Sequence, residues 1–277
     1  MKFGIAIFPT DYAISMTELA PAVEERGFES LWVAEHSHIP TSRESPWPGG
    51  PDLPKHYWHT MDPFIALTAA ALASKTLKVA TGICLLIQRD PIHTAKETAS
   101  VDLISGGRLI FGIGAGWNRE EMADHGTNFG MRWQLLREKT EAIKAIWSED
   151  AAEYHGEMVG FGPMWSWPKP VQKPHPPVIL GGSGPKILER VVRYADGWMP
   201  NRGDVLARIP ELERMAKDAG RGRMPVTYYP KATAEEIERC AQAGVDRLIW
   251  YVPPDGRDAA LTRLEELTKL VRPYLTN

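Results

Sequence analysis

Glu35, His36, Ser37 and His38 follow a short apolar segment and bring acid–base groups together. Because an imidazole titrates near neutral pH, His36 can act as a general base or donate a hydrogen bond to a cofactor ring. The His36–His38 pair, with two histidines in the following loop, also permits a zinc site, while His38 equally suits an ordinary rim residue. Glu35 is a second candidate for catalysis, and if buried we expect it to be paired.

A second chemical signal is a run of glycines at Gly112, Gly114 and Gly116, at the end of an apolar segment. A glycine is needed where the backbone approaches another group so closely that no Cβ fits. The run therefore predicts the floor of a ligand site. A tight bend between a strand and a helix explains the same glycines without a ligand.

A third signal is Gly181-Gly182-Ser183-Gly184, which lies between an apolar segment and a helical one. Free amides at a helix start, the helix dipole and the Ser183 hydroxyl together suit a phosphate group. The distance to Lys186 does not fit a Walker loop. A simple helix start explains Ser183 as well, but it does not require three glycines in four residues.

Short apolar segments that alternate with helical patterns must position these groups. Strands are predicted at 2–8, 30–35, 77–84, 109–113, 177–180, 197–200, 226–229 and 247–252. Helix starts are predicted by capping residues at Ser15, Asp62, Asp90, Asn118, Thr233 and Asp258.

Strands that alternate with helices imply a parallel sheet with helical crossovers. An open doubly wound sheet and a closed (β/α)8 TIM barrel both satisfy the pattern, and eight units in 277 residues favour the barrel. We therefore predict a single barrel domain over residues 1–277. The carboxyl ends of its strands would then bring the three signals to one mouth.

Two long segments without periodicity, at about 37–61 and 150–176, are rich in proline and tryptophan and are predicted to be lid loops at the carboxyl-terminal face. Aromatic loop residues suggest a site that stacks a planar or apolar ligand. We expect four residues to contact a substrate: Trp47, Trp58, Trp117 and Asn118.

Composition restricts the partners. The net charge of −3 and the pI near 6.3 provide no basic field for nucleic acid and no polybasic membrane patch, so we expect a small-molecule substrate. Cys84 and Cys240 are each isolated, which argues against a disulfide framework and a thiolate metal site. The start of the chain lacks the apolar segment of a signal peptide, so we expect a cytoplasmic protein.

Several motifs, in order along nearly the whole chain, resemble the bacterial-luciferase-like family of flavin and deazaflavin enzymes. They are V-A-E-H at 33–36, T-G-I at 81–83, R-D-P at 89–91, G-G-R-L at 106–109, F-G-I-G-A-G-W-N at 111–118 and I-L-G-G-S-G at 179–184. The compact second half resembles the branch that uses coenzyme F420.

The resemblance implies a (β/α)8 barrel, often dimeric, that holds the ring of F420 or FMN across its mouth. It also implies a cis peptide bond at Gly82-Ile83 or Ile83-Cys84, a ring-proximal His36 and a cofactor-phosphate loop at 181–184. We expect these residues to contact the cofactor: His36, Thr81, Gly82, Ile83, Cys84, Gly114, Ala115, Gly116, Gly181, Gly182, Ser183 and Gly184.

The resemblance predicts an F420-dependent oxidoreductase that transfers a hydride between the deazaflavin C5 and an apolar or aromatic substrate. An FMN-dependent monooxygenase is the alternative. Relatives that oxidise sugar phosphates carry a glutamate at the position of Ala115, and an alanine transfers no proton, so a cofactor-binding protein without turnover also stays open. Metal-assisted hydrolysis lacks further ligands at later strand ends.

Overall fold

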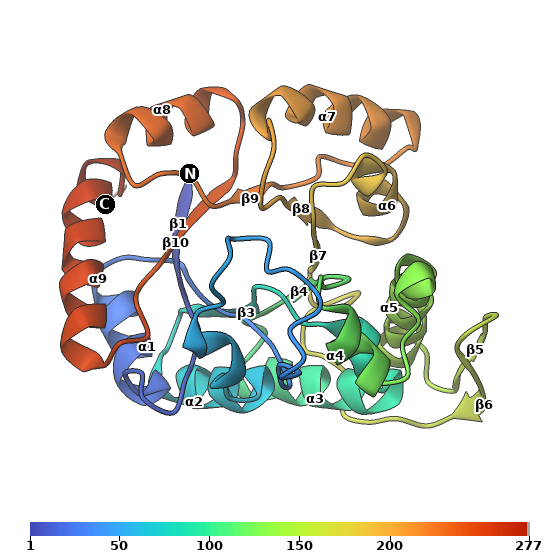
Figure 1. Ribbon diagram of the computed structural model, residues 1–277. Helices are drawn as coiled ribbons and strands as arrows, with labels where there is room; N and C mark the ends of the chain where they lie inside the picture. The colour runs from blue at the N-terminus through green and yellow to red at the C-terminus, as the bar shows by residue number, and fades with distance from the viewer. Residues whose placement is uncertain (276–277) are drawn as a thin grey trace.

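Eight parallel strands follow one another along the chain in the computed structural model, which describes residues 1–275 (Figure 1). They are β1 (Lys2–Ile7), β2 (Ser30–Val33), β3 (Lys78–Thr81), β4 (Leu109–Ile113), β7 (Val178–Gly181), β8 (Gly197–Met199), β9 (Thr227–Tyr228) and β10 (Arg247–Tyr251). Most are short, largely apolar runs, as expected for strands that are covered on both faces.

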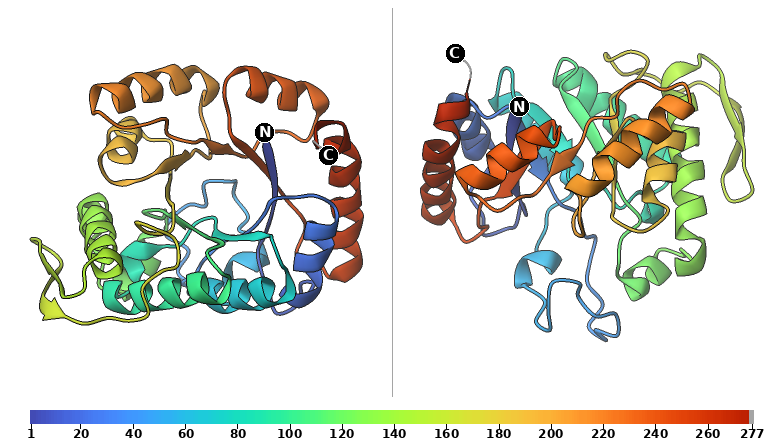
Figure 2. Two further views of the ribbon diagram at one scale, coloured as in Figure 1. Left: turned by 180° about the vertical axis from the view of Figure 1, so that it is seen from behind. Right: turned by 90° about the horizontal axis from the view of Figure 1, so that it is seen from above.

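Helices surround these strands (Figure 2). They are α1 (Met16–Glu25), α2 (Pro63–Ala73), α3 (Pro91–Ile104), α4 (Arg119–Asp124), α5 (Arg132–Ser148), α6 (Ile187–Tyr194), α7 (Ile209–Asp218), α8 (Ala234–Gln242) and α9 (Arg257–Val271). Within residues 1–275 no helix combines the length and apolar character that crossing a bilayer requires.

The sheet closes on itself. Its strand order is β8-β7-β4-β3-β2-β1-β10-β9, and a parallel bridge between Trp198 and Val226 joins the two ends. At this seam the Trp198 amide donates to the Pro225 carbonyl at 2.9 Å. The predicted (β/α)8 barrel is therefore confirmed, and the open sheet is excluded.

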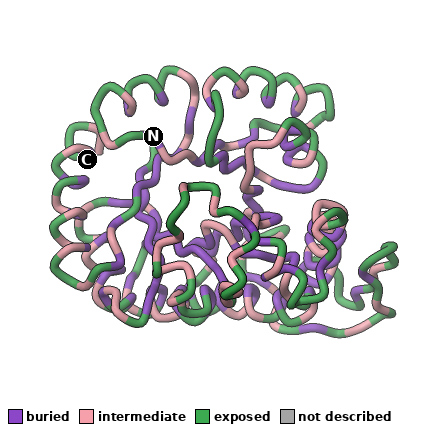
Figure 3. Tube along the Cα trace, viewed as in Figure 1, coloured by how far each residue is buried: buried purple, intermediate pink, exposed green. Residues whose placement is uncertain are grey.

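Side chains from the strands fill the barrel interior, and a larger cluster fills the space between strands and helices. The interior cluster is formed by Ala6, Trp32, Ala80, Ile110, Ile179, Met199 and Ile249. Because the interior is a packed core, ligands have access only at the barrel ends. The buried strands and half-buried helices stand out in Figure 3.

Four of the predicted helix caps are confirmed. The side chains of Asp62, Asp90, Asn118 and Thr233 each accept a hydrogen bond from a backbone N–H in the first turn of the helix that follows. α1 also begins directly after Ser15, as predicted, but the Ser15 side chain makes no capping bond and pairs with Thr17 instead. The cap at Asp258 was wrongly predicted, because α9 begins at Arg257 after Gly256.

The 37–61 loop follows β2 and projects from the carboxyl-terminal end of the barrel, where it includes the short helix η1 (Lys55–Trp58) (Figure 2). The 150–176 segment was wrongly predicted to be an irregular lid. It contains a hairpin, β5 (Ala152–His155) and β6 (Gly160–Met164), on the flank of the barrel. The segment follows a helix, and Glu138 of α5 fastens the hairpin by accepting from the Met158 amide at 2.8 Å.

The end of β3 departs from the predicted strand 77–84. The strand ends at Thr81, the Gly82–Ile83 peptide bond is cis, and the chain then rejoins the sheet through a bridge between Cys84 and Ile113. One of the two bonds that the resemblance identified is therefore cis. The departure turns the Ile83 side chain toward the neighbouring strand ends.

The glycines beside this departure are needed for packing. A Cβ on Gly112 would lie 2.0 Å from the Thr81 carbonyl oxygen, and one on Gly114 would lie 2.3 Å from Ile83 Cδ1. A Cβ on Gly181 would lie 2.9 Å from Ile83 Cγ2. The group that these glycines approach is thus the end of β3, where the Ile83 side chain and the strand ends form a surface that we call the Ile83 floor.

We expect Gly112→Ala to lower the free energy of unfolding by about 1–3 kcal/mol, because the methyl group meets backbone that cannot move away cheaply. Gly162→Ala is the matched control, since nothing lies within 4 Å of its Cβ position. Chemical denaturation of both variants measures the difference. Equal stability of the two variants would contradict the packing described here.

Candidate active site at the barrel mouth

A cleft of about 580 Å³ opens at the carboxyl ends of the strands, and we call it the mouth cleft. Many of the residues predicted from the sequence line it. They are Glu35, His36, Gly82, Ile83, Gly114, Ala115, Gly116, Trp117, Gly181, Gly182, Ser183 and Gly184. Three clusters that are distant along the chain therefore meet around one opening, as the barrel requires.

Five of the predicted residues do not line the mouth cleft. The Thr81 hydroxyl donates to the Gly112 carbonyl, Cys84 is fully buried, and Asn118 caps α4. Trp47 packs edge-on against Tyr57, and Trp58 is 47% exposed on the loop. Of these residues, Trp47 supports the lining residue Tyr57, and the side chains of Thr81, Cys84 and Asn118 do not face the cleft.

His36 is held by a buried carboxylate. Its Nδ1 lies 2.8 Å from Glu121 Oε2, and the two side chains are only 6% and 1% exposed. The Ser37 amide donates to the other carboxylate oxygen of Glu121 at 3.2 Å. Because a carboxylate only accepts, this contact places a proton on Nδ1 and leaves Nε2 free to accept or donate a proton.

Glu121 was not predicted as a site residue. The N-x-x-E pattern at 118–121 explains its backbone amide, which donates to Asn118 Oδ1 at 3.1 Å. Its carboxylate, however, points to His36 rather than back to the helix start. The pattern alone contains no signal for that direction.

Glu35 occupies the base of the cleft as one half of a buried ion pair. Its oxygens accept from Arg89 Nε at 2.6 Å and from the Leu85 amide at 2.7 Å. Arg89 also binds Asp62 and Glu97. The expected pairing of a buried Glu35 is confirmed. With both carboxylate oxygens bonded, Glu35 orders residues 85–89 beside the floor, while its catalytic role stays a prediction.

The side chain of Ser183 anchors the 181–184 loop. Ser183 Oγ donates to Asn201 Oδ1 at 2.9 Å and accepts from the amides of Asn201 and Arg202 at 3.1 Å each. A Cβ on Gly182 would lie 3.1 Å from Ile187 Cδ1. The Ser183 hydroxyl therefore ties the loop to the segment after β8 and shapes the rim between them.

Four cations gather at this rim: Arg132 at the start of α5, Lys186 and Arg190 at the start of α6, and Arg202 after β8. Among the described residues no carboxylate forms an ion pair with any of them. Burial, followed by the neighbouring charges of Arg190 and Arg119, lowers the pKa of Arg132. The sequence predicted the loop but not this cluster of positive charges. A bound anionic group would reduce the repulsion between them.

The opposite wall of the cleft is aromatic. Tyr57 and Trp117 lie with ring centres 5.1 Å and 5.9 Å from that of His36. Tyr229 stacks on Tyr251 at 5.3 Å, and its buried hydroxyl has no hydrogen-bond partner among residues 1–275. Burial raises the pKa of Tyr229, so this hydroxyl keeps its proton and can donate to a ligand.

The histidines at the rim do not assemble a metal site. His38 lies outside the cleft, where its Nε2 is 2.9 Å from Asp124 Oδ2 and its Nδ1 is 2.9 Å from Ser37 Oγ. Within residues 1–275 no three His, Cys, Asp or Glu side chains are arranged to hold a metal ion. His38 is therefore a rim residue, one of the interpretations that the sequence allowed.

Comparison with known proteins identifies the family. The family model described as "Luciferase-like monooxygenase" matches residues 1–274, and the chain belongs to that family. The resemblance noted from the motifs is confirmed, and with it the general class of the protein: a luciferase-like oxidoreductase or monooxygenase.

Individual relatives extend over the full chain. An uncharacterized protein of Mycobacterium tuberculosis is 38% identical over 275 residues, covering 96% of this chain and 97% of the relative. The coenzyme F420 dependent tetrahydromethanopterin reductase of Methanopyrus kandleri superposes with a TM-score of 0.79 at 20% identity, covering 99% of both chains. The monooxygenase RslO1 of Streptomyces bottropensis superposes with a TM-score of 0.78 at 20% identity, covering 100% of both.

The His36–Glu121 contact predicts the tautomer of the neutral imidazole. We expect His36 to carry its proton on Nδ1, whereas Glu121→Gln, whose amide can donate to Nδ1, should move the proton to Nε2. Nitrogen-15 NMR of the histidine side chains at a pH where they are neutral distinguishes the two forms. The 85%-exposed side chain of His93 serves as an internal control and should not change. An Nε2–H tautomer in the unmodified protein would contradict the assignment.

Proposed function

We propose that this protein is an F420-dependent oxidoreductase that transfers a hydride between the deazaflavin C5 and an apolar or aromatic organic substrate. The proposal depends above all on one observation. The Ile83 floor, the His36–Glu121 pair and the four-cation rim surround a single cleft of about 580 Å³. A planar ring with an anionic tail has complementary shape and charge.

The residues present fit such a cofactor. Gly114 and Gly181 make room for the Ile83 side chain, so backbone and one branched side chain form a floor on which a flat ring can lie. The Ser183 loop and the cations Arg132, Lys186, Arg190 and Arg202 would hold the tail. Because F420 carries carboxylates beyond its phosphate, four unpaired cations suit it better than the single phosphate of FMN.

The chain's own chemistry is then binding and proton transfer. When bound, F420 supplies a two-electron carrier that exchanges a hydride at C5. His36 would take up or release the substrate proton at Nε2, with Glu121 fixing the ring and its tautomer. Ala115 lines the cleft without an acid group and both oxygens of Glu35 are bonded, so we assign the proton transfer to His36, with the Tyr229 hydroxyl as a hydrogen-bond donor.

An FMN-dependent monooxygenase is the second candidate. The observation in its favour is the aromatic wall, since the oxygen chemistry that a reduced flavin would supply requires a pocket that excludes water. Oxygen consumption with reduced FMN as the sole flavin separates the two candidates. Turnover with reduced FMN and none with F420 would support the alternative.

We expect F420 to bind in the micromolar range and Arg190→Gln to weaken it by about tenfold or more, because a charge-assisted contact to the tail is lost. Fluorescence titration measures both constants. Arg193→Gln is the matched control, because Arg193 is exposed on the same helix and should leave the affinity unchanged. Tight binding of FMN with no binding of F420 would refute the proposal.

A further inference from the structure

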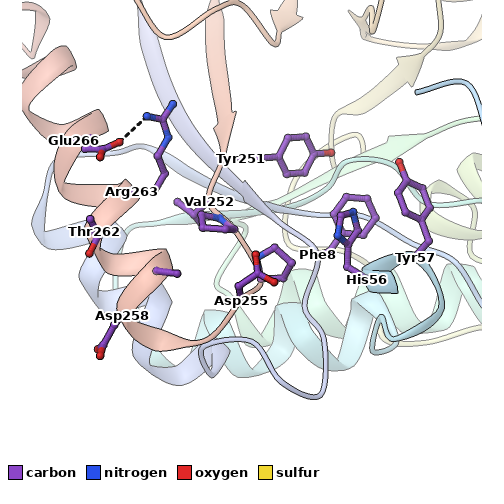
Figure 4. A pocket seen from close by; sticks show the side chains of 13 residues that line it. Phe8, His56, Tyr57, Tyr251, Val252, Asp255, Asp258, Thr262, Arg263 and Glu266 are labelled. Carbon is purple, nitrogen blue, oxygen red and sulfur yellow. Dashed lines mark hydrogen bonds and ion pairs between the residues drawn. The ribbon is translucent and has the colours of Figure 1, made fainter. Parts of the chain in front are cut away.

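A second cavity of about 820 Å³ lies beside the mouth cleft, and we call it the side chamber (Figure 4). Its inner wall consists of Phe8, Tyr57 and Tyr251, which also line the mouth cleft. Its outer wall comes from the segment after β10 and from α9. The two cavities therefore adjoin each other at these three aromatic residues.

The inner wall is a cluster of stacked and tilted rings. The ring centre of Phe8 lies 4.3 Å from that of His56, 4.9 Å from that of Tyr57 and 5.7 Å from that of Tyr251. Val252 and Pro253 add apolar surface, and Ala259 leaves room on the α9 side. Such a wall favours a ring-bearing group over a flexible polar chain.

The charges around the side chamber are mostly negative. Asp255 stands between the α9 side chains and the aromatic rings in Figure 4 and forms no ion pair among residues 1–275, whereas Asp258 is paired with Arg257 at 3.2 Å. Arg263 is neutralised by Glu266 at 2.7 Å. His56 faces Asp255, yet burial lowers its pKa, so it is neutral near pH 7. An anionic group is therefore disfavoured here.

The side of the mouth that lies across the barrel from the side chamber is positively charged. The cations Arg132, Lys186, Arg190 and Arg202 lie near α5 and α6, which stand across the barrel from α9 in Figure 1. An anionic cofactor tail is thus drawn to one side. The side chamber is left for a ligand group without negative charge.

We propose that the side chamber binds the distal, uncharged, ring-bearing part of an elongated substrate whose reacting carbon lies beside His36 in the mouth cleft. This inference rests on the proposed function and deepens it by naming the substrate class. Phosphorylated and carboxylated substrates are excluded from the class, because the charge beside α9 repels them.

Binding of a neutral aromatic dye, N-phenylnaphthylamine, to the full chain tests this directly. We expect saturable fluorescence enhancement, weakened about tenfold or more by Thr262→Trp, which fills the side chamber from the exposed face of α9. Ala259→Trp should act in the same way, and thermal unfolding shows whether either variant still folds. Lys269→Trp, exposed on α9 outside the chamber, should bind as the unmodified protein does.

The sulfonated analogue anilinonaphthalene sulfonate should bind about tenfold more weakly than the neutral dye, since only its charge differs substantially. Equal binding of the two dyes, or equal binding by folded Thr262→Trp and Lys269→Trp, would overturn the proposal. Dye binding that decreases as the protein dimerises would instead assign this face to a second copy and overturn it as well. F420 titration is measured separately, so loss of cofactor binding leaves the dye result interpretable.

Discussion

The site depends on one packing constraint, the insertion of Ile83 over the ends of three strands. β3, β4 and β7 converge at the mouth, and the Ile83 side chain occupies the space that Cβ atoms at 114 and 181 would fill. Gly112 in turn lies against the Thr81 carbonyl. The result is a smooth apolar floor made of backbone and one branched side chain. The other groups of the cleft are arranged around that floor.

Positive and negative side chains lie on different sides of the floor. Positive side chains from α5, α6 and the segment after β8 lie on one side of the mouth, and acidic side chains from α9 and the segment before it lie on the other. His36 stands between them in an aromatic setting and is fixed by Glu121. Under the proposed function, these parts of the opening would hold an anionic cofactor tail, the transferred proton and an uncharged substrate. The two sides of the mouth differ in charge rather than in a specific hydrogen bond.

Local sequence patterns predicted the barrel and its mouth because they record local physics. Alternating apolar runs identified the strands, and Asp62 and Asp90 marked helix starts through short-range capping bonds. The glycines at 112 and 114 indicated a close approach, although the partner proved to be the end of β3 as well as the cleft. The hairpin at 150–176 was mistaken for a lid because proline and tryptophan content does not tell which end of the barrel a segment occupies. The position of the segment directly after a helix, however, does indicate the end of the barrel at which it begins.

The remaining site residues depend on contacts that no local pattern contains. Glu121 meets His36 across 85 positions of sequence, and only the fold reveals that its carboxylate turns inward. The rim cations come from two helices and a loop, so they form a cluster only after the barrel closes. Tyr57 and Tyr251 likewise join from a loop and a late strand to divide the mouth cleft from the side chamber.

A crystal structure of the protein soaked with F420 tests the central claim most directly, because it locates ring and tail together. We expect the ring on the Ile83 floor beside His36, with the tail phosphate at the 181–184 loop and the tail running toward Arg190. A tail directed toward α9, or a ring bound away from Ile83, would contradict it.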